Sequence, residues 1–137
     1  MPISFDISQR PDFAFLTVQL PAGEKIHSEP GAMATMTENI KLTAGLKGGV
    51  MASIKRGLGG ESLIISTYEA QGSDGEVSFA AGQPGDTVHY QMDGTGELYL
   101  QRGAYLANTD GVEISSKWQG MKGFFSGEGL ILLKCSG

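Results

Sequence analysis

The chain has 137 residues, of which 40% are hydrophobic, and a formal net charge of −5 at pH 7. This length is typical of one ordinary domain with a sizeable core. The acidic balance argues against the broad basic surface with which proteins bind nucleic acid, so nucleic acid is not an expected partner. A single cysteine, Cys135, excludes an intrachain disulfide and indicates a reducing compartment.

The chain shows no targeting or membrane-spanning pattern. Its first residues lack a basic segment followed by a long apolar run, so they do not form a signal peptide. No stretch approaches the roughly 20 apolar residues that a membrane helix needs. We therefore expect a cytoplasmic protein.

The 21 glycines punctuate short apolar runs without a period of three residues. Residues 3–7 alternate as a half-buried strand does, and 13–20 are rich in aromatic and β-branched residues. Residues 24–29 are short and mostly polar, which predicts an edge strand. Further strands are predicted at 37–43, 61–69, 77–79, 87–92, 98–100, 112–114 and 130–133. Short strands separated by glycine and proline turns predict an all-β sandwich or barrel.

At most one short helix is expected, near 50–57. There Val50, Met51, Ile54 and Leu58 stand at helical spacing, and Gly57 can cap the turn.

Much of the chain occurs twice. From Gly31 to Leu42 the sequence matches a second copy at a constant offset of 72 residues, and 16–20 match 88–92 at the same offset. The offset is 73 at the preceding Gly-Glu pair and 67 at the following one. The repeat predicts one β domain made of two pseudo-repeats, 1–72 and 73–137. The fold class is then an internally duplicated antiparallel β-sandwich, or a short double-stranded β-helix.

The repeat also carries a family resemblance. The segments that carry it are Pro30-Gly31-Ala32-Met33, Arg56 to Ser62, Pro84-Gly85-Asp86, Gln101 to Ala107, Lys117 to Gly120 and Ser126 to Leu130. In this order they resemble the altered-inheritance-of-mitochondria protein family, member twenty-four of that series. The resemblance covers the chain from about Gly23 to Gly137.

The resemblance implies a fold similar to that of the trp RNA-binding attenuation protein. It also implies a role as an assembly factor, since the mitochondrial relative is linked to inner-membrane organisation. No catalytic residue is carried over. Members are usually longer by a further copy of the repeat, so we expect either a short form or part of a longer member. A missing copy leaves a bare sheet edge or apolar face, which self-association can cover.

Catalytic and metal chemistry find little support. His27 and His89 lie at different positions of the two copies, without ligands at metal-binding spacing, and Cys135 has no nearby base. The glycine-rich stretch 44–60 lacks the phosphate-loop pattern. Glu61 and Glu128 are repeat-equivalent, which favours turn stabilisation over acid–base catalysis. We predict no catalytic residue, metal or cofactor and no identifiable small-molecule ligand.

Five residues are assigned to structural motifs. Arg102 is expected to pair with an acid such as Asp86 or Asp110. The structural set is Gly31, Glu61, Arg102, Gly103 and Glu128.

Two equivalent loops, 44–60 and 117–126, mix apolar residues with cations. Three interpretations stay open for them: satellite cores, an interface between copies of the chain, or a peripheral contact with lipid. The candidate interaction residues are Leu46, Met51, Ile54, Leu58, Trp118, Met121, Phe124 and Phe125. We predict a non-enzymatic β scaffold or assembly factor that forms a homo-oligomer. The alternative is a membrane-surface or small-ligand binding module that uses these loops.

Overall fold

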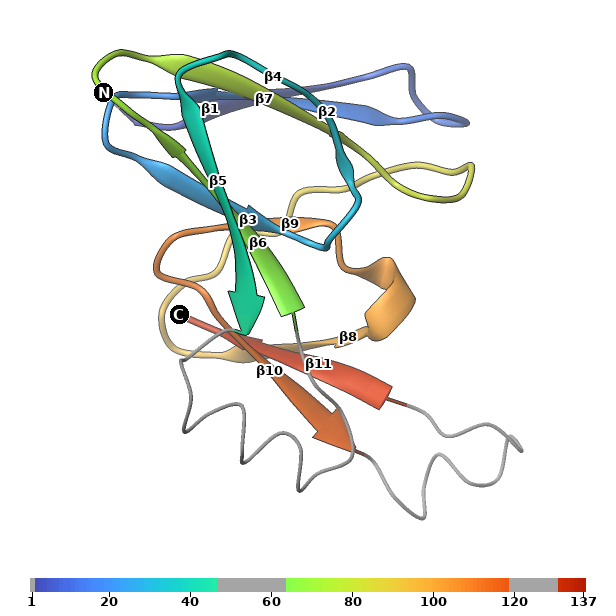
Figure 1. Cartoon of the computed structure of the whole chain (residues 1–137). Coiled ribbons are helices and arrows are strands. Elements are labelled where there is room, and N and C mark those ends of the chain that lie inside the picture. Colours follow the sequence, from blue (N-terminus) through green and yellow to red (C-terminus); the bar gives the residue numbers. More distant parts are fainter. Residues whose placement is uncertain (1, 47–63, 119–130) are drawn as a thin grey trace. The chain divides into compact units, whose positions relative to one another are not determined.

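A computed structural model of the chain describes residues 2–46, 64–118 and 131–137 (Figure 1). These residues form strands and one 3-10 turn, η1 (Arg102–Ala104), with no α-helix among them. The strands are β1 (Ser4–Ser8), β2 (Phe15–Leu20), β3 (Lys25–Ser28), β4 (Met33–Met36), β5 (Ile40–Leu46), β6 (Ile64–Ala70), β7 (Gly75–Ala80), β8 (Glu97–Gln101), β9 (Ala107–Thr109), β10 (Glu113–Trp118) and β11 (Ile131–Ser136). The predicted all-β, sandwich-like class is confirmed. The helix predicted near 50–57 lies outside the described residues.

The strands form three sheets, in the orders β1-β2-β7-β4, β5-β6-β3-β9 and β10-β11-β8. All the strand pairs with a defined register are antiparallel. Contacts divide the chain into two compact units. The first comprises 1–44, 65–90 and 106–110, and the second comprises 45–64, 91–105 and 111–137.

The core of the first unit comes from strands of two sheets. On β2, Val18 and Leu20 are buried while Gln19 between them is exposed, which is the alternation that the sequence predicts. Tyr68 on β6 meets Phe79 on β7 edge to face, with ring centroids 5.3 Å apart. Such an aromatic pair contributes about 0.5–1.5 kcal/mol beyond the area it buries.

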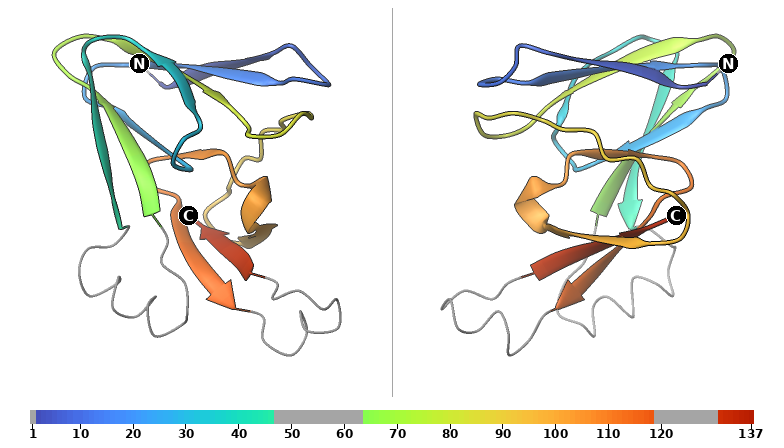
Figure 2. Two further views of the ribbon diagram at one scale, coloured as in Figure 1. Left: turned by 45° about the vertical axis from the view of Figure 1, so that its right-hand side comes forward. Right: turned by 180° about the vertical axis from the view of Figure 1, so that it is seen from behind.

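The second unit is organised around β11, which pairs with β10 on one side and β8 on the other (Figure 2). Among the described residues of this unit, the buried hydrophobic ones are Tyr105, Ile114, Leu133 and Cys135. Lys134 of β11 donates to Glu97 of β8 at 2.8 Å, which raises the pKa of the Lys134 ammonium.

The internal repeat is visible in strand order. β5-β6-β3 in the first copy and β10-β11-β8 in the second follow the same order. Lys25 stands opposite Glu69, and its counterpart Glu97 stands opposite Ser136. The structural offset between β3 and β8 is therefore 72 residues, not the 73 that aligning the Gly-Glu pairs suggests. A single β domain made of two pseudo-repeats, 1–72 and 73–137, stays a prediction, as does the similarity to the attenuation-protein fold.

The prediction of an edge strand at 24–29 is wrong. β3 is central, with β6 on one side and β9 on the other. Its polar side chains tolerate burial because they have partners: His27 bonds Thr67 and Asp110, and Ser28 donates to the Glu29 carbonyl.

The strand predicted at 87–92 is also absent, although its sequence matches β2. A strand there would pair by a hairpin with β7, the strand before it in the chain. However, β7 already pairs with β2 on one edge and β4 on the other. The segment therefore has a strand-like sequence but no free edge on its natural hairpin partner.

Candidate interaction surface

The turn between β1 and β2 binds the backbone at Gly85. Gln9 adopts a left-handed conformation with φ 58°, and the Arg10–Pro11 peptide bond is cis. Ala14 N–H donates to the Gly85 carbonyl at 3.0 Å, and Gly85 N–H donates to the Asp12 carbonyl at 2.5 Å. Gly85 has φ 147°, a backbone conformation that residues other than glycine rarely adopt. These bonds fix where the following segment, 86–90, begins.

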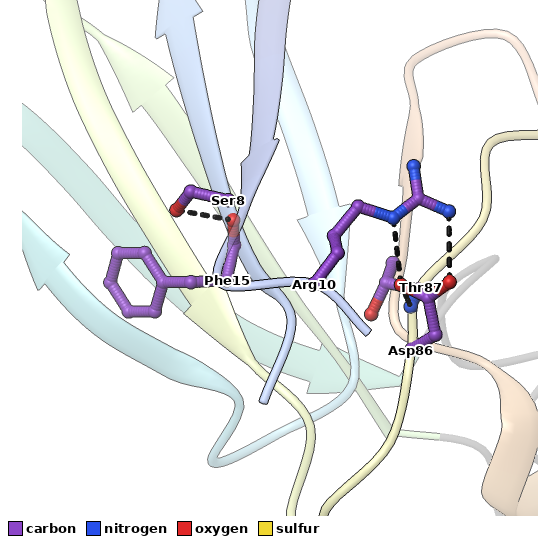
Figure 3. A network of polar contacts seen from close by, with 5 residues as sticks. All are labelled: Ser8, Arg10, Phe15, Asp86 and Thr87. Carbon is purple, nitrogen blue, oxygen red and sulfur yellow. Dashed lines mark hydrogen bonds and ion pairs between the residues drawn. The ribbon is translucent and has the colours of Figure 1, made fainter. Parts of the chain in front are cut away.

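An exposed ion pair then fastens the segment to the turn (Figure 3). The Arg10 guanidinium donates from Nε to Asp86 Oδ1 at 2.8 Å and from Nη2 to Asp86 Oδ2 at 2.9 Å. Thr87 N–H donates to the same carboxylate at 2.9 Å. The bonds from Arg10 lower the pKa of Asp86, and the bond to Asp86 raises the pKa of Arg10. The planar fork of arginine fixes an orientation that lysine would not.

An aromatic contact fastens the same segment to β1. The His89 ring lies 4.7 Å from the Phe5 ring between centroids, at an interplanar angle of 50°. Both contacts join the segment to the β1–β2 hairpin through side chains. Among the described residues, no backbone hydrogen bond joins 88–90 to a strand.

Large apolar side chains are exposed around this segment. The exposed fraction is 76% for Val88, 62% for Tyr90, 68% for Phe13 and 45% for Phe5. We call these four residues the apolar strip. Val18 is the repeat counterpart of Tyr90 and is only 1% exposed. A position that builds the core in the first copy is thus open to solvent in the second. Exposed apolar residues are ordinary one by one, and it is their number on this segment and on the hairpin that holds it that makes the region a candidate interaction site.

A second polar arrangement lies in the other sheet of the first unit. The His27 Nδ1 atom is 2.9 Å from Thr67 Oγ1, and its Nε2 atom is 2.9 Å from Asp110 Oδ1. Hydroxyl, imidazole and carboxylate in series resemble the groups that activate nucleophiles. Here the His27 side chain is only 9% exposed and both ring nitrogens have hydrogen-bond partners, so neither is available to a metal ion or a substrate. The arrangement serves to tie β3 to β6 and to the turn after β9.

Most predicted interaction residues lie outside the described ranges. These are Met51, Ile54, Leu58, Glu61, Met121, Phe124, Phe125 and Glu128. Leu46 ends β5, and Trp118 ends β10 opposite Ile131. Most of the two predicted loops therefore lies outside the residues that the structure describes.

The remaining predicted residues are in the described part. Gly31 has φ 83°, which the turn between β3 and β4 requires. Arg102 and Gly103 form η1. Of the two acids proposed for Arg102, Asp86 pairs with Arg10 and Asp110 bonds His27.

Sequence reasoning missed the apolar strip and its ion pair. The available signal was the match of 88–92 to 16–20. This match places apolar side chains where a buried strand should be, while both edges of β7 are taken.

The three antiparallel sheets place the protein in the all-β, sandwich-like class. The chain belongs to the mitochondrial biogenesis AIM24 family, whose model matches residues 5–137. The expected family is thereby confirmed. No curated protein matches the chain. Across the described residues, no helix has both the length and the apolar character needed to cross a membrane.

One solved structure is similar over nearly the whole chain. It is the crystal structure of protein SPYM3_0169 from Streptococcus pyogenes, with a TM-score of 0.77 and 27% sequence identity. The match covers 99% of this chain and 61% of that one, so this chain spans less than two thirds of that protein.

Proposed function

We propose that this protein is a non-enzymatic β scaffold or assembly factor that self-associates, acting in the cytoplasm. The family description relates its members to mitochondrial biogenesis, which fits an assembly role. The apolar strip supports self-association most directly.

The composition of the strip suits a protein interface. Two of its members are phenylalanine and one is tyrosine, and aromatic residues are enriched in the buried centres of interfaces. Burying apolar surface contributes about 25 cal/mol per Å². Arg10 and Asp86, beside the strip, already pair with each other. Covering the apolar residues would therefore leave neither of these two charges without its partner.

Light scattering coupled to gel filtration tests this proposal over a range of concentrations. We expect the native chain to form a dimer or larger species, and Val88→Ser with Tyr90→Ser to shift it towards monomer. Leu42→Ser is a matched control, because Leu42 is an exposed apolar residue of the first unit on another strand, β5. A native chain that stays monomeric would overturn the proposal.

Vesicle flotation tests the membrane alternative. Vesicles of anionic and zwitterionic lipid are mixed with the native chain and with the Val88/Tyr90 variant. We expect neither protein to float. Flotation of a monomeric native chain that the variant loses would assign the apolar strip to lipid and overturn self-association.

A further inference from the structure

Residues 88–90 occupy repeat positions that normally carry a paired strand. Val88, His89 and Tyr90 correspond to Leu16, Thr17 and Val18 at the offset of 72. In β2 those three residues face β1 on one side and β7 on the other. The second-copy segment has the same apolar alternation without either neighbour.

β1 is the repeat counterpart of β7. Phe5 corresponds to Val77 and Ile7 to Phe79 at the same offset. β7 has a neighbour on each edge, whereas within the described residues β1 pairs with β2 alone. Within the described residues, the chain thus carries both a strand-like segment that makes no strand pairing and an edge strand, β1, that pairs on one side only.

We propose that residues 86–90 of one copy add as a strand to the open edge of β1 in a second copy. This inference rests on the proposed self-association and specifies its geometry. The pairing follows the register that β7 adopts on β2, in which Val77 opposes Val18 and Phe79 opposes Leu16. Transferred by the repeat, Tyr90 opposes Phe5 of the partner subunit and Val88 opposes Ile7 of the partner subunit.

Contacts inside one chain support this register. Arg10 bonds Asp86 and Phe5 contacts His89, so 86–89 already runs antiparallel to 5–10 in nearly the same alignment. The partner's Phe5 would cover Tyr90, which the contacts within one chain leave exposed. The proposed pairing exchanges the Arg10–Asp86 ion pair and the Phe5–His89 contact of one chain for the same contacts between two copies.

A second copy also provides a strand partner for both the segment 86–90 and the edge of β1. Each chain gives one segment and receives one on its β1 edge, so a twofold axis closes the assembly as a dimer. Added strands gain main-chain hydrogen bonds along the edge, and the alternate side chains set the register. An exposed strand edge left without a partner is otherwise an aggregation site.

Disulfide trapping in a Cys135→Ser background tests the pairing. Two chains of different tag length are mixed, one with Phe5→Cys and one with Tyr90→Cys, and are oxidised gently. Directly opposite residues have Cβ atoms about 4.5–5.5 Å apart, close enough to cross-link after small shifts. We expect a covalent heterodimer of defined mass. Phe5→Cys with Val88→Cys, two positions out of register, should yield at least several-fold less.

Light scattering on the same samples separates the outcomes. Dimers that give no Phe5–Tyr90 disulfide would overturn the strand pairing and leave the scaffold proposal standing. Monomers that give none would overturn both. A single chain carrying both cysteines that closes internally at high dilution, with no heterodimer in the mixture, would show that 86–90 pairs with its own β1.

Discussion

Ile40 fills the space directly beside Gly75: a Cβ atom added to Gly75 would stand 2.6 Å from Ile40 Cδ1. Thr37 Oγ1 and Asn39 Oδ1 would be 3.0 Å and 3.2 Å from it. Gly75 begins β7 and pairs with Leu20, so the strand cannot move away without disturbing a core pair. The absence of a side chain at this position is what lets the 37–40 turn pack against β7.

Gly75→Ala should therefore destabilise the protein. Overpacking a well-packed site typically costs about 1–3 kcal/mol. Chemical denaturation with urea measures the change. Gly82→Ala is the control, because no atom lies within 4 Å of a Cβ added there. Equal stability of the two variants would contradict the packing account.

Replacing His27 should loosen the sheet that contains β3. His27→Leu removes the bonds to Thr67 and Asp110 and leaves the half-buried Thr67 hydroxyl without its imidazole partner. Losing such a bond at a buried site costs about 1–3 kcal/mol. Thermal unfolding followed by circular dichroism should show a lower midpoint for His27→Leu than for the native chain. An unchanged midpoint for His27→Leu would refute this role.

Acid should release the Arg10–Asp86 contact. The bonds from Arg10 lower the pKa of Asp86 in the folded chain, so the contact stabilises the fold at pH values above the unfolded value, about 3.9. The contribution disappears as the pH falls through the lower, folded value. Native protein should thus unfold at a higher urea concentration than Asp86→Asn at pH 7, and the two curves should converge in strong acid. A difference that grows on acidification would have the wrong sign.

The Cys135 thiol should resist alkylation in the native state. Burial raises its pKa, so the reactive thiolate is scarce at neutral pH, and the side chain is shielded. Ellman's reagent at pH 7.5 should react slowly with native protein and at once in denaturant. Rapid reaction of the native chain would show that β11 opens readily.

Local signals predicted the all-β class correctly. Alternating side chains and turn glycines depend on near neighbours, so they can be recognised in the sequence alone. Strand partners depend on distant segments, so the polar sequence of β3 wrongly predicts an edge strand. For the same reason the sequence does not predict that 88–90 forms no strand, since only the structure shows that β2 and β4 occupy both edges of β7.

The candidate site shows the limit more clearly. The predicted interface residues came from loop composition, and most lie outside the described ranges. Arg10 and Asp86 are 76 positions apart, so no spacing rule joins them. Val88 and Tyr90 fit an ordinary strand pattern in the sequence, and only the structure shows that they are exposed.

The oligomeric mass of the native chain is the most direct test of the central claim. One chain has a mass of 14.4 kDa. Sedimentation equilibrium should give twice that mass for the native protein and a shift towards 14.4 kDa for Val88→Ser with Tyr90→Ser. A native chain that remains at 14.4 kDa at every concentration would contradict the account.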